Sequence, residues 1–217
     1  YVERDARQLI NLRNIRPFET FIRLLAGRVG QLINLSSLAG DVGVSAVTLR
    51  EWLSVLEASY IIWTIQPYFE NFGKRLIKSP KIYFTETGLA AYLLGLRTPE
   101  QVGRDPLLGN LFENMVATEA LKANLNAGKD RDLYFFRDSQ GLEVDLLLTS
   151  GRKLIPIEIK AAHTPHHDLS RGVERFSTLT QEAQHPTVIY AGRNIPSQAA
   201  PSFLNFKETT QFIRNCH

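Results

Sequence analysis

Two neighbouring segments of alternating apolar and charged residues, within Leu142–Lys160, constrain this chain more than any other feature. In the first segment apolar side chains take every second position, and Glu143 and Asp145 lie between them. Because side chains along a strand alternate between two faces, both carboxylates are expected on one face. A Ser-Gly turn signal follows, and the second segment carries Glu158 and Lys160 in the same alternating pattern.

Paired as a hairpin, these strands bring three carboxylates and one ammonium into a small volume. Like charges at such short range raise one another's pKa unless a cation or the lysine compensates them. Magnesium takes oxygen ligands from one or two carboxylates and keeps several waters. The sequence therefore predicts a Mg²⁺ or Mn²⁺ site at Glu143, Asp145 and Glu158, with Lys160 beside it.

Composition limits the class of protein. The 217 residues are 44% hydrophobic, which suits a substantial core, and we expect two domains. One cysteine, Cys216, excludes disulfides within the chain and favours a reducing compartment. No apolar run approaches the roughly 20 residues that span a bilayer, and no leader opens the chain, so we expect a soluble, cytoplasmic protein without a membrane partner. The chain begins at Tyr1 and its methionine is Met115, which indicates a piece of something longer.

The charge is distributed unevenly. The formal net charge is +3, and residues 1–106 hold 13 basic and 10 acidic side chains while residues 107–217 hold 12 of each. Within the first half, residues 71–81 contain four basic side chains and no acid. This cluster is either a solvated loop or a contact for phosphates.

The first half is expected to be helical, with a break at Pro17. A short helix opened by Ser36 or Ser37 runs to Val42, Gly43 allows a turn, and Ser45 caps a second helix. Two extended pieces, residues 60–65 and 81–84, follow on either side of the basic loop. Helix, turn, helix and hairpin is the order of a winged helix.

In a DNA-binding winged helix the second helix enters the major groove. Thr48, Arg50 and Glu51 would then be outermost. Lys74, Arg75 and Lys78 would touch phosphates. The alternative is that this small domain only packs against a partner. Fold alone does not choose between these two interpretations.

The predicted division is a helical and winged-helix domain at 1–96, a connector at 97–106 and an α/β domain at 107–217. The last begins with a helix to about Asn126, followed by three strands, a helix, a buried strand and a closing helix. On the first helix Glu113 has no basic neighbour three or four positions away. It either reaches solvent or points at something positive elsewhere in the fold.

Asp145, then twelve intervening residues, then Glu158-Ile159-Lys160, resembles the PD-(D/E)XK signature of the restriction-endonuclease-like nucleases. This resemblance implies a restriction-endonuclease-like α/β core. It also implies magnesium held by Asp145 and Glu158, with Glu113 and Glu143 as supplementary acids, and Lys160 acting on the attacking water or the phosphate.

The chain also resembles the carboxy-terminal region of prokaryotic AAA-like ATPases that carry the domain called DUF4143. The similar blocks lie between residues 1 and 160 and include 53–61, 78–84, 109–114 and 156–160. Glu86 departs from that pattern, which has aspartate there. The resemblance implies an ATPase domain preceding Tyr1. The sequence has no phosphate-binding P-loop motif, so we expect no ATP site in this fragment.

Two functions remain open from the sequence. In the first, the chain is a metal-dependent nuclease with catalytic Asp145, Glu158 and Lys160, and the winged helix holds DNA. In the second, it is a non-catalytic DNA-binding or protein-interaction region of the ATPase, with a relic acid cluster. The sequence leaves strand specificity and oligomeric state undetermined.

Overall fold

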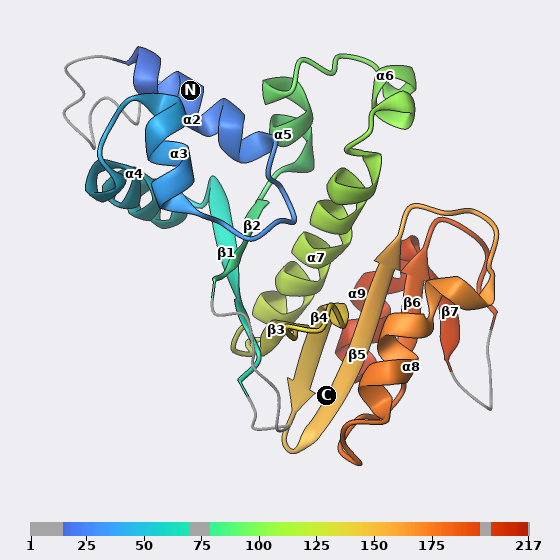
Figure 1. Ribbon diagram of the computed structural model, residues 1–217. Coiled ribbons are helices and arrows are strands. Elements are labelled where there is room, and N and C mark those ends of the chain that lie inside the picture. The colour runs from blue at the N-terminus through green and yellow to red at the C-terminus, as the bar shows by residue number, and fades with distance from the viewer. Residues whose placement is uncertain (1–14, 70–78, 196–200, 217) are drawn as a thin grey trace. The chain divides into compact units, whose positions relative to one another are not determined.

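The computed structural model describes residues 15–69, 79–195 and 201–216, and within them the chain is a mixed α/β protein (Figure 1). The described residues form two compact units. The first holds residues 15–64 and 79–111, and the second holds residues 65–69, 112–195 and 201–216. The α/β class predicted from the sequence is confirmed.

These units differ in three ways from the predicted division at 97–106. Residues 65–69, expected in the first domain, belong to the second unit. The expected connector contains helix α6 (Pro99–Arg104), which opens with a capping box formed by Thr98 and Gln101 and belongs to the first unit. The next helix, α7 (Leu108–Asn126), begins in the first unit and continues into the second. The boundary between the units therefore falls inside a continuous helix, after Leu111, and not in a linker at 97–106.

Four further helices form the first unit: α2 (Arg16–Ala26), α3 (Leu35–Val42), α4 (Ala46–Ala58) and α5 (Thr87–Leu93). Pro17 lies in the first turn of α2, and the helix expected before it falls on residues 1–14, outside the described residues. Asn34, rather than Ser36 or Ser37, caps α3, because its side chain accepts from the Ser37 N–H at 3.1 Å. Gly43 has a φ of 77°, which is the left-handed conformation that the predicted turn requires.

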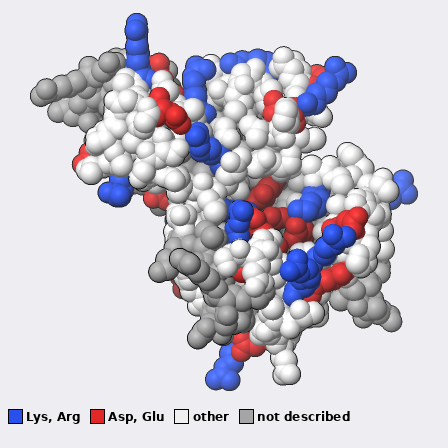
Figure 2. All heavy atoms as spheres, in the orientation of Figure 1, with Lys and Arg blue, Asp and Glu red and all other residues white. Residues whose placement is uncertain are grey.

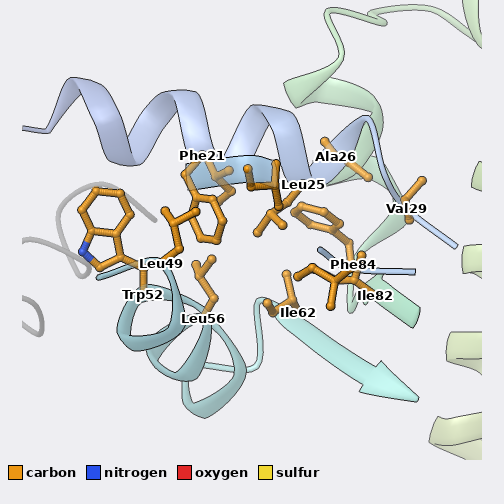
Figure 3. Close-up of a cluster of buried hydrophobic side chains, with 14 of the residues drawn as sticks. Phe21, Leu25, Ala26, Val29, Leu49, Trp52, Leu56, Ile62, Ile82 and Phe84 are labelled. Carbon is orange, nitrogen blue, oxygen red and sulfur yellow. The ribbon is translucent and has the colours of Figure 1, made fainter. Parts of the chain in front are cut away.

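The core of this unit joins α2 and α4 to two strands, β1 (Ile62–Pro67) and β2 (Lys81–Phe84) (Figure 3). Trp52 meets Phe18 edge to face, with ring centroids 5.4 Å apart. The Thr85 N–H, just beyond β2, donates to the carbonyl of Ile61, just before β1, so the strands run antiparallel. The two extended pieces expected near 60–65 and 81–84 are confirmed; residues 70–78 lie outside the described residues.

The strands form a seven-stranded mixed sheet in the order β2-β1-β3-β4-β5-β6-β7. In the second unit the further strands are β3 (Leu133–Arg137), β4 (Glu143–Ser150), β5 (Lys153–Lys160), β6 (Thr187–Tyr190) and β7 (Ser202–Asn205). Strands β4 and β5 pair as the antiparallel hairpin that the sequence predicts. Strands β5, β6 and β7 pair in parallel, and β7 was not predicted.

Two helices lie on opposite sides of β5 and β6 (Figure 1): α8 (Arg171–Ser177) and α9 (Thr209–Asn215). Two short 3-10 turns precede them, η1 (His167–Leu169) and η2 (Phe206–Glu208). On the α8 side Phe136 and Phe176 meet edge to face at 5.0 Å within a buried cluster. No helix among the described residues is long and apolar enough to cross a membrane.

Ser45 begins α4, and its hydroxyl accepts from the Thr48 N–H at 3.1 Å. Replacing a capping serine by alanine leaves that N–H without its acceptor, at a cost of about 1 kcal/mol. We expect Ser45→Ala to lower the free energy of unfolding by this amount in urea titration. Ser54, exposed within the same helix, is the matched control, and Ser54→Ala should cause no loss. Equal effects of the two substitutions would contradict the capping role.

Candidate active site

A bulge in β4 shapes the region around Asp145. Tyr134 of β3 lies opposite Leu147, but Phe136 lies opposite Val144, so two residues of β4 oppose one residue of β3. Asp145 is one of those two residues. A bulge bends its strand and redirects the side chains within it. It also breaks the strict alternation predicted for this strand, so Val144 and Leu147 share one buried cluster.

The turn before β4 is fixed by Asp138. This side chain is buried, and its carboxylate accepts from the N–H groups of Gln140 and Leu142, each at 2.9 Å. Gly141 takes a φ of 87°, which favours glycine. The turn therefore fixes the position of Glu143, the first residue of β4.

Asp145 is held by the neighbouring strand. It is 6% exposed, and its Oδ2 accepts from the backbone N–H of Ile159 at 2.9 Å. The same oxygen lies 3.5 Å from Nζ of Lys160. The regular β4–β5 pairing reaches Leu146 opposite Ile157, so just beyond it the Asp145 side chain accepts an N–H of β5. This contact fixes the carboxylate at the end of the hairpin.

Glu158 is the most perturbed group of the cluster. Its Oε1 lies 2.6 Å from Nζ of Lys160, whereas its Oε2 is buried and has no hydrogen-bond partner among the described residues. Burial is the main reason that its pKa rises to about 8, and the charges of Asp145 and Glu143 raise it further. Lys160 opposes this increase in pKa without cancelling it.

Gly172 of helix α8 packs against the Glu158 side chain. A Cβ atom at this position would lie 2.6 Å from Oε2 of Glu158 and 2.8 Å from the carbonyl oxygen of Glu143. Both distances are shorter than the contacts that Cβ atoms make in folded proteins. The glycine therefore leaves the space that the Glu158 carboxylate occupies.

The ammonium of Lys160 lies among several carboxylates. Burial lowers the pKa of its ammonium, but Asp145, Glu158 and Glu113 together raise the pKa above its ordinary value. Glu113 is half-buried on α7, so it faces something positive, which was one of its two expected positions. Glu143 also forms an ion pair with Arg137 at 3.2 Å.

The structure thus brings together the five residues predicted for the second-half site: Glu113, Glu143, Asp145, Glu158 and Lys160. The residues predicted for nucleic-acid contact are divided. Thr48 and Arg50 lie on α4 in the first unit, whereas Lys74, Arg75 and Lys78 lie outside the described residues.

Lys160 contacts both carboxylates and so takes the place of a counter-ion. In the ranges that the structure describes, no three or more His, Cys, Asp or Glu side chains are grouped to hold a metal ion. Acidic and basic side chains gather together on the face that carries β4, β5 and α8 (Figure 2). The Lys160 side chain remains 36% exposed, so solvent and solutes reach this cluster from one side.

Sequence reasoning missed Gly172, Arg137 and the bulge. The only sequence signal for Gly172 is a glycine inside an otherwise helical segment, which often marks close packing. Arg137 directly precedes the predicted turn, and its pairing with Glu143 depends on the hairpin register. Nothing in the local alternation predicts an extra residue opposite β3.

Comparison with known families matches the two halves of the chain to different models. Residues 108–208 match Domain of unknown function (DUF4143). The resemblance to this family is therefore confirmed for that range. Residues 1–100, where the resemblance to DUF4143 was also expected, match Domain of unknown function (DUF8612).

The chain is also similar to two uncharacterized proteins, Mb2031c of Mycobacterium bovis and Rv2008c of Mycobacterium tuberculosis. Each is 33% identical over 198 residues, which cover 89% of this chain and 42% of the relative. The chain therefore spans less than half the length of these relatives. No solved structure matches it.

Gly172 provides a direct test of the packing around Glu158. In an open helix position, glycine to alanine stabilises a protein by about 0.5–1 kcal/mol. We expect Gly172→Ala instead to destabilise by about 1–3 kcal/mol, because the new methyl group overlaps the Glu158 carboxylate. Gly40→Ala in α3, where nothing lies within 4 Å, is the control and should stabilise. Urea unfolding of both variants measures the sign, and stabilisation by both would show that the contact is absent.

The raised pKa of Glu158 predicts a pH-dependent stability. Between pH 4.5 and about 8 the folded chain keeps a proton that the unfolded chain has lost. Stability from this group is therefore complete below pH 4.5 and falls as the pH rises through 8, by up to about 1.4 kcal/mol per pH unit.

Glu158→Gln removes this titration, so its free energy of unfolding should fall less across the same pH range than that of the wild type. Chemical unfolding at a series of pH values from 4 to 9 measures the difference. Glu119→Gln, at a half-buried position on α7 where the side chain is 46% exposed, should follow the wild-type curve. Superimposable curves for Glu158→Gln and the wild type would refute the raised pKa.

Proposed function

We propose that the second unit hydrolyses phosphodiester bonds of nucleic acid with Mg²⁺ or Mn²⁺ bound at Asp145 and Glu158. The observation that carries this proposal is the buried Oε2 of Glu158, which lacks a partner among the described residues and belongs to the cluster formed with Asp145 and Lys160. An unpaired buried polar atom costs about 1–3 kcal/mol. Such a cost, together with a strongly shifted pKa, is typical of functional sites.

The donor chemistry fits a hard divalent cation. Magnesium commonly binds through one or two carboxylates while keeping several waters, and Asp145 and Glu158 supply two. Entry of a cation requires Lys160 to turn away from Glu158, and its partly exposed side chain has solvent to turn into. Once bound, the ion would polarise the phosphoryl oxygens and activate water.

The chain's own groups have separate roles in this proposal. The Ile159 N–H holds Asp145 in place. Lys160 supplies positive charge where the attacked phosphate gains negative charge. Glu113 helps to keep that lysine protonated, and Glu143 is a supplementary acid whose charge acts on Glu158. A restriction-endonuclease-like core is the fold that we propose for this unit.

For the first unit we propose a winged helix that grips DNA. Helices α3 and α4 with the turn at Gly43 support this proposal, and Arg50 is exposed on α4. Thr48 is half-buried, and its hydroxyl lies 2.9 Å from that of Ser45. Lys74, Arg75 and Lys78 are the proposed phosphate contacts.

We propose that the chain is part of a longer cytoplasmic protein with a preceding ATPase domain. The supporting observation is that it spans 42% of the length of its mycobacterial relatives. In this arrangement nucleotide hydrolysis elsewhere in the protein would control access of DNA to the acid cluster.

A second candidate is a non-catalytic DNA-binding or protein-interaction region of the same ATPase. The contacts of Lys160 with both carboxylates favour it, because they already neutralise the cluster without a metal ion. Breaking such a buried network is costly, so it would be retained for stability alone. Cleavage distinguishes the two candidates.

The test is incubation of the intact chain with single- and double-stranded DNA and Mn²⁺. We expect cleavage, reduced about 100-fold or more by Lys160→Ala, which removes positive charge beside the attacked phosphate. Asp145→Asn should reduce it similarly, because it removes a carboxylate ligand of the proposed ion. Lys153→Ala, exposed at the opposite end of β5, should cleave like the wild type.

Equal cleavage by the wild type and Lys160→Ala would indicate a contaminating nuclease and overturn the assignment. Metal-dependent binding without cleavage would select the second candidate. Far-ultraviolet circular dichroism of each variant verifies that the lost activity does not reflect lost folding.

A further inference from the structure

A pocket of about 490 Å³ lies beside the acid cluster, at the carboxyl ends of β5, β6 and β7. Its lining includes His163, Pro165, Tyr190, Gly192, Arg193 and Asn205, none of which contributes to the cluster. Ligands of open sheets with parallel strands commonly bind outside the carboxyl ends of those strands. The volume falls within the range of about 300–1,000 Å³ that is usual for small-molecule sites.

The sheet register connects this pocket to Lys160. Lys160 of β5 is the register partner of Tyr190 in β6, which is the partner of Asn205 in β7. Register partners on neighbouring parallel strands point to the same face, and neighbouring strands lie about 4.8 Å apart. The pocket therefore begins one strand away from the ammonium of Lys160, on the face that carries Glu158.

The pocket floor is held in one conformation by contacts within the chain. The Asn205 side chain donates to the carbonyl of Gly192, and the Tyr190 hydroxyl donates to the carbonyl of Arg193. A Cβ atom at Gly192 would overlap the Tyr190 ring and the carbonyl oxygen of His163. Close packing around a glycine and two side-chain anchors preorganise the loop that carries Arg193.

The lining has the chemistry of an anion site. Arg193 and His163 are exposed at the pocket, and no aspartate or glutamate belongs to its lining. A guanidinium binds phosphate oxygens through paired N–H donors, and an imidazole adds a further donor. The neighbouring acid cluster has the opposite character, so negative ligands are directed to this side of Lys160.

We propose that this pocket binds the nucleotide next to the scissile phosphate of a nucleic-acid strand, with Arg193 and His163 contacting its phosphate. This inference rests on the proposed function, because it places the attacked phosphate at Lys160. The adjoining phosphate then lies over Arg193, and the remaining volume accommodates the sugar and base. A free nucleotide offers the same phosphate chemistry, and the experiment separates the two.

The experiment is calorimetric titration of the intact chain, in EDTA, with the 5′-phosphorylated dinucleotide pdTpT. Arg193→Ala should weaken binding about tenfold, because it removes a charge-assisted contact to phosphate. Arg152→Ala, exposed in the turn between β4 and β5, is the matched control and should bind like the wild type. Equal affinity of Arg193→Ala and the wild type, or no binding by the wild type, would overturn the inference.

Titration with the mononucleotide dTMP and with inorganic phosphate identifies the ligand. Weaker binding of both than of pdTpT supports a nucleic-acid strand. Binding of dTMP as tight as that of pdTpT would assign the pocket to a free nucleotide and overturn the strand assignment.

Comparison with the cleavage assay separates this inference from the proposed function. Binding that depends on Arg193, in a chain that cleaves nothing with Mn²⁺, would retain the pocket and reject the nuclease. Cleavage that depends on Lys160, with KM unchanged by Arg193→Ala, would retain the nuclease and reject the pocket.

Discussion

The second unit depends on how it compensates negative charge beneath helix α8. Asp145 and Glu158 are both nearly buried, and two neighbouring carboxylates repel each other strongly in a medium of low polarisability. The fold balances them with one ammonium, one backbone N–H and one retained proton. Lys160, Ile159 and the raised pKa of Glu158 are the three parts of this balance. Oε2 of Glu158 is buried and has no hydrogen-bond partner among the described residues.

The surrounding secondary structure follows from the need to hold these groups close together. The turn at Asp138 sets the start of β4, the bulge redirects Asp145, and Gly172 lets α8 approach Glu158. Helix α7 adds Glu113 from a distant part of the sequence. Four separate segments thus contribute to one electrostatic arrangement.

Much of this fold is predictable from local patterns. The capped helices before residue 60, the strand at Lys81–Phe84 and the β4–β5 hairpin have strong periodicity and turn signals, and the structure confirms them. Two elements were missed because their signals are weak or hidden. Strand β7 is short and only partly buried, and α6 lies in a stretch rich in proline, glycine and charge, where its Thr98–Gln101 capping box is the one clear signal.

The candidate site was predictable in its membership but not in its geometry. Residue types and spacing in Leu142–Lys160 identify which side chains gather. They do not reveal that Lys160 contacts both carboxylates, because that depends on tertiary distances. Nor does an alternating pattern reveal a bulge, since a strand with one extra residue reads locally like a regular one.

The bulge in β4 also bears on how this domain can diverge. Deletion of Leu146 would restore regular pairing with β3 and rotate Asp145 away from Ile159. The hairpin would survive, since its pairing from Leu147 onward depends on other residues. Descendants of one ancestor could therefore keep the same scaffold while differing in chemistry through one codon.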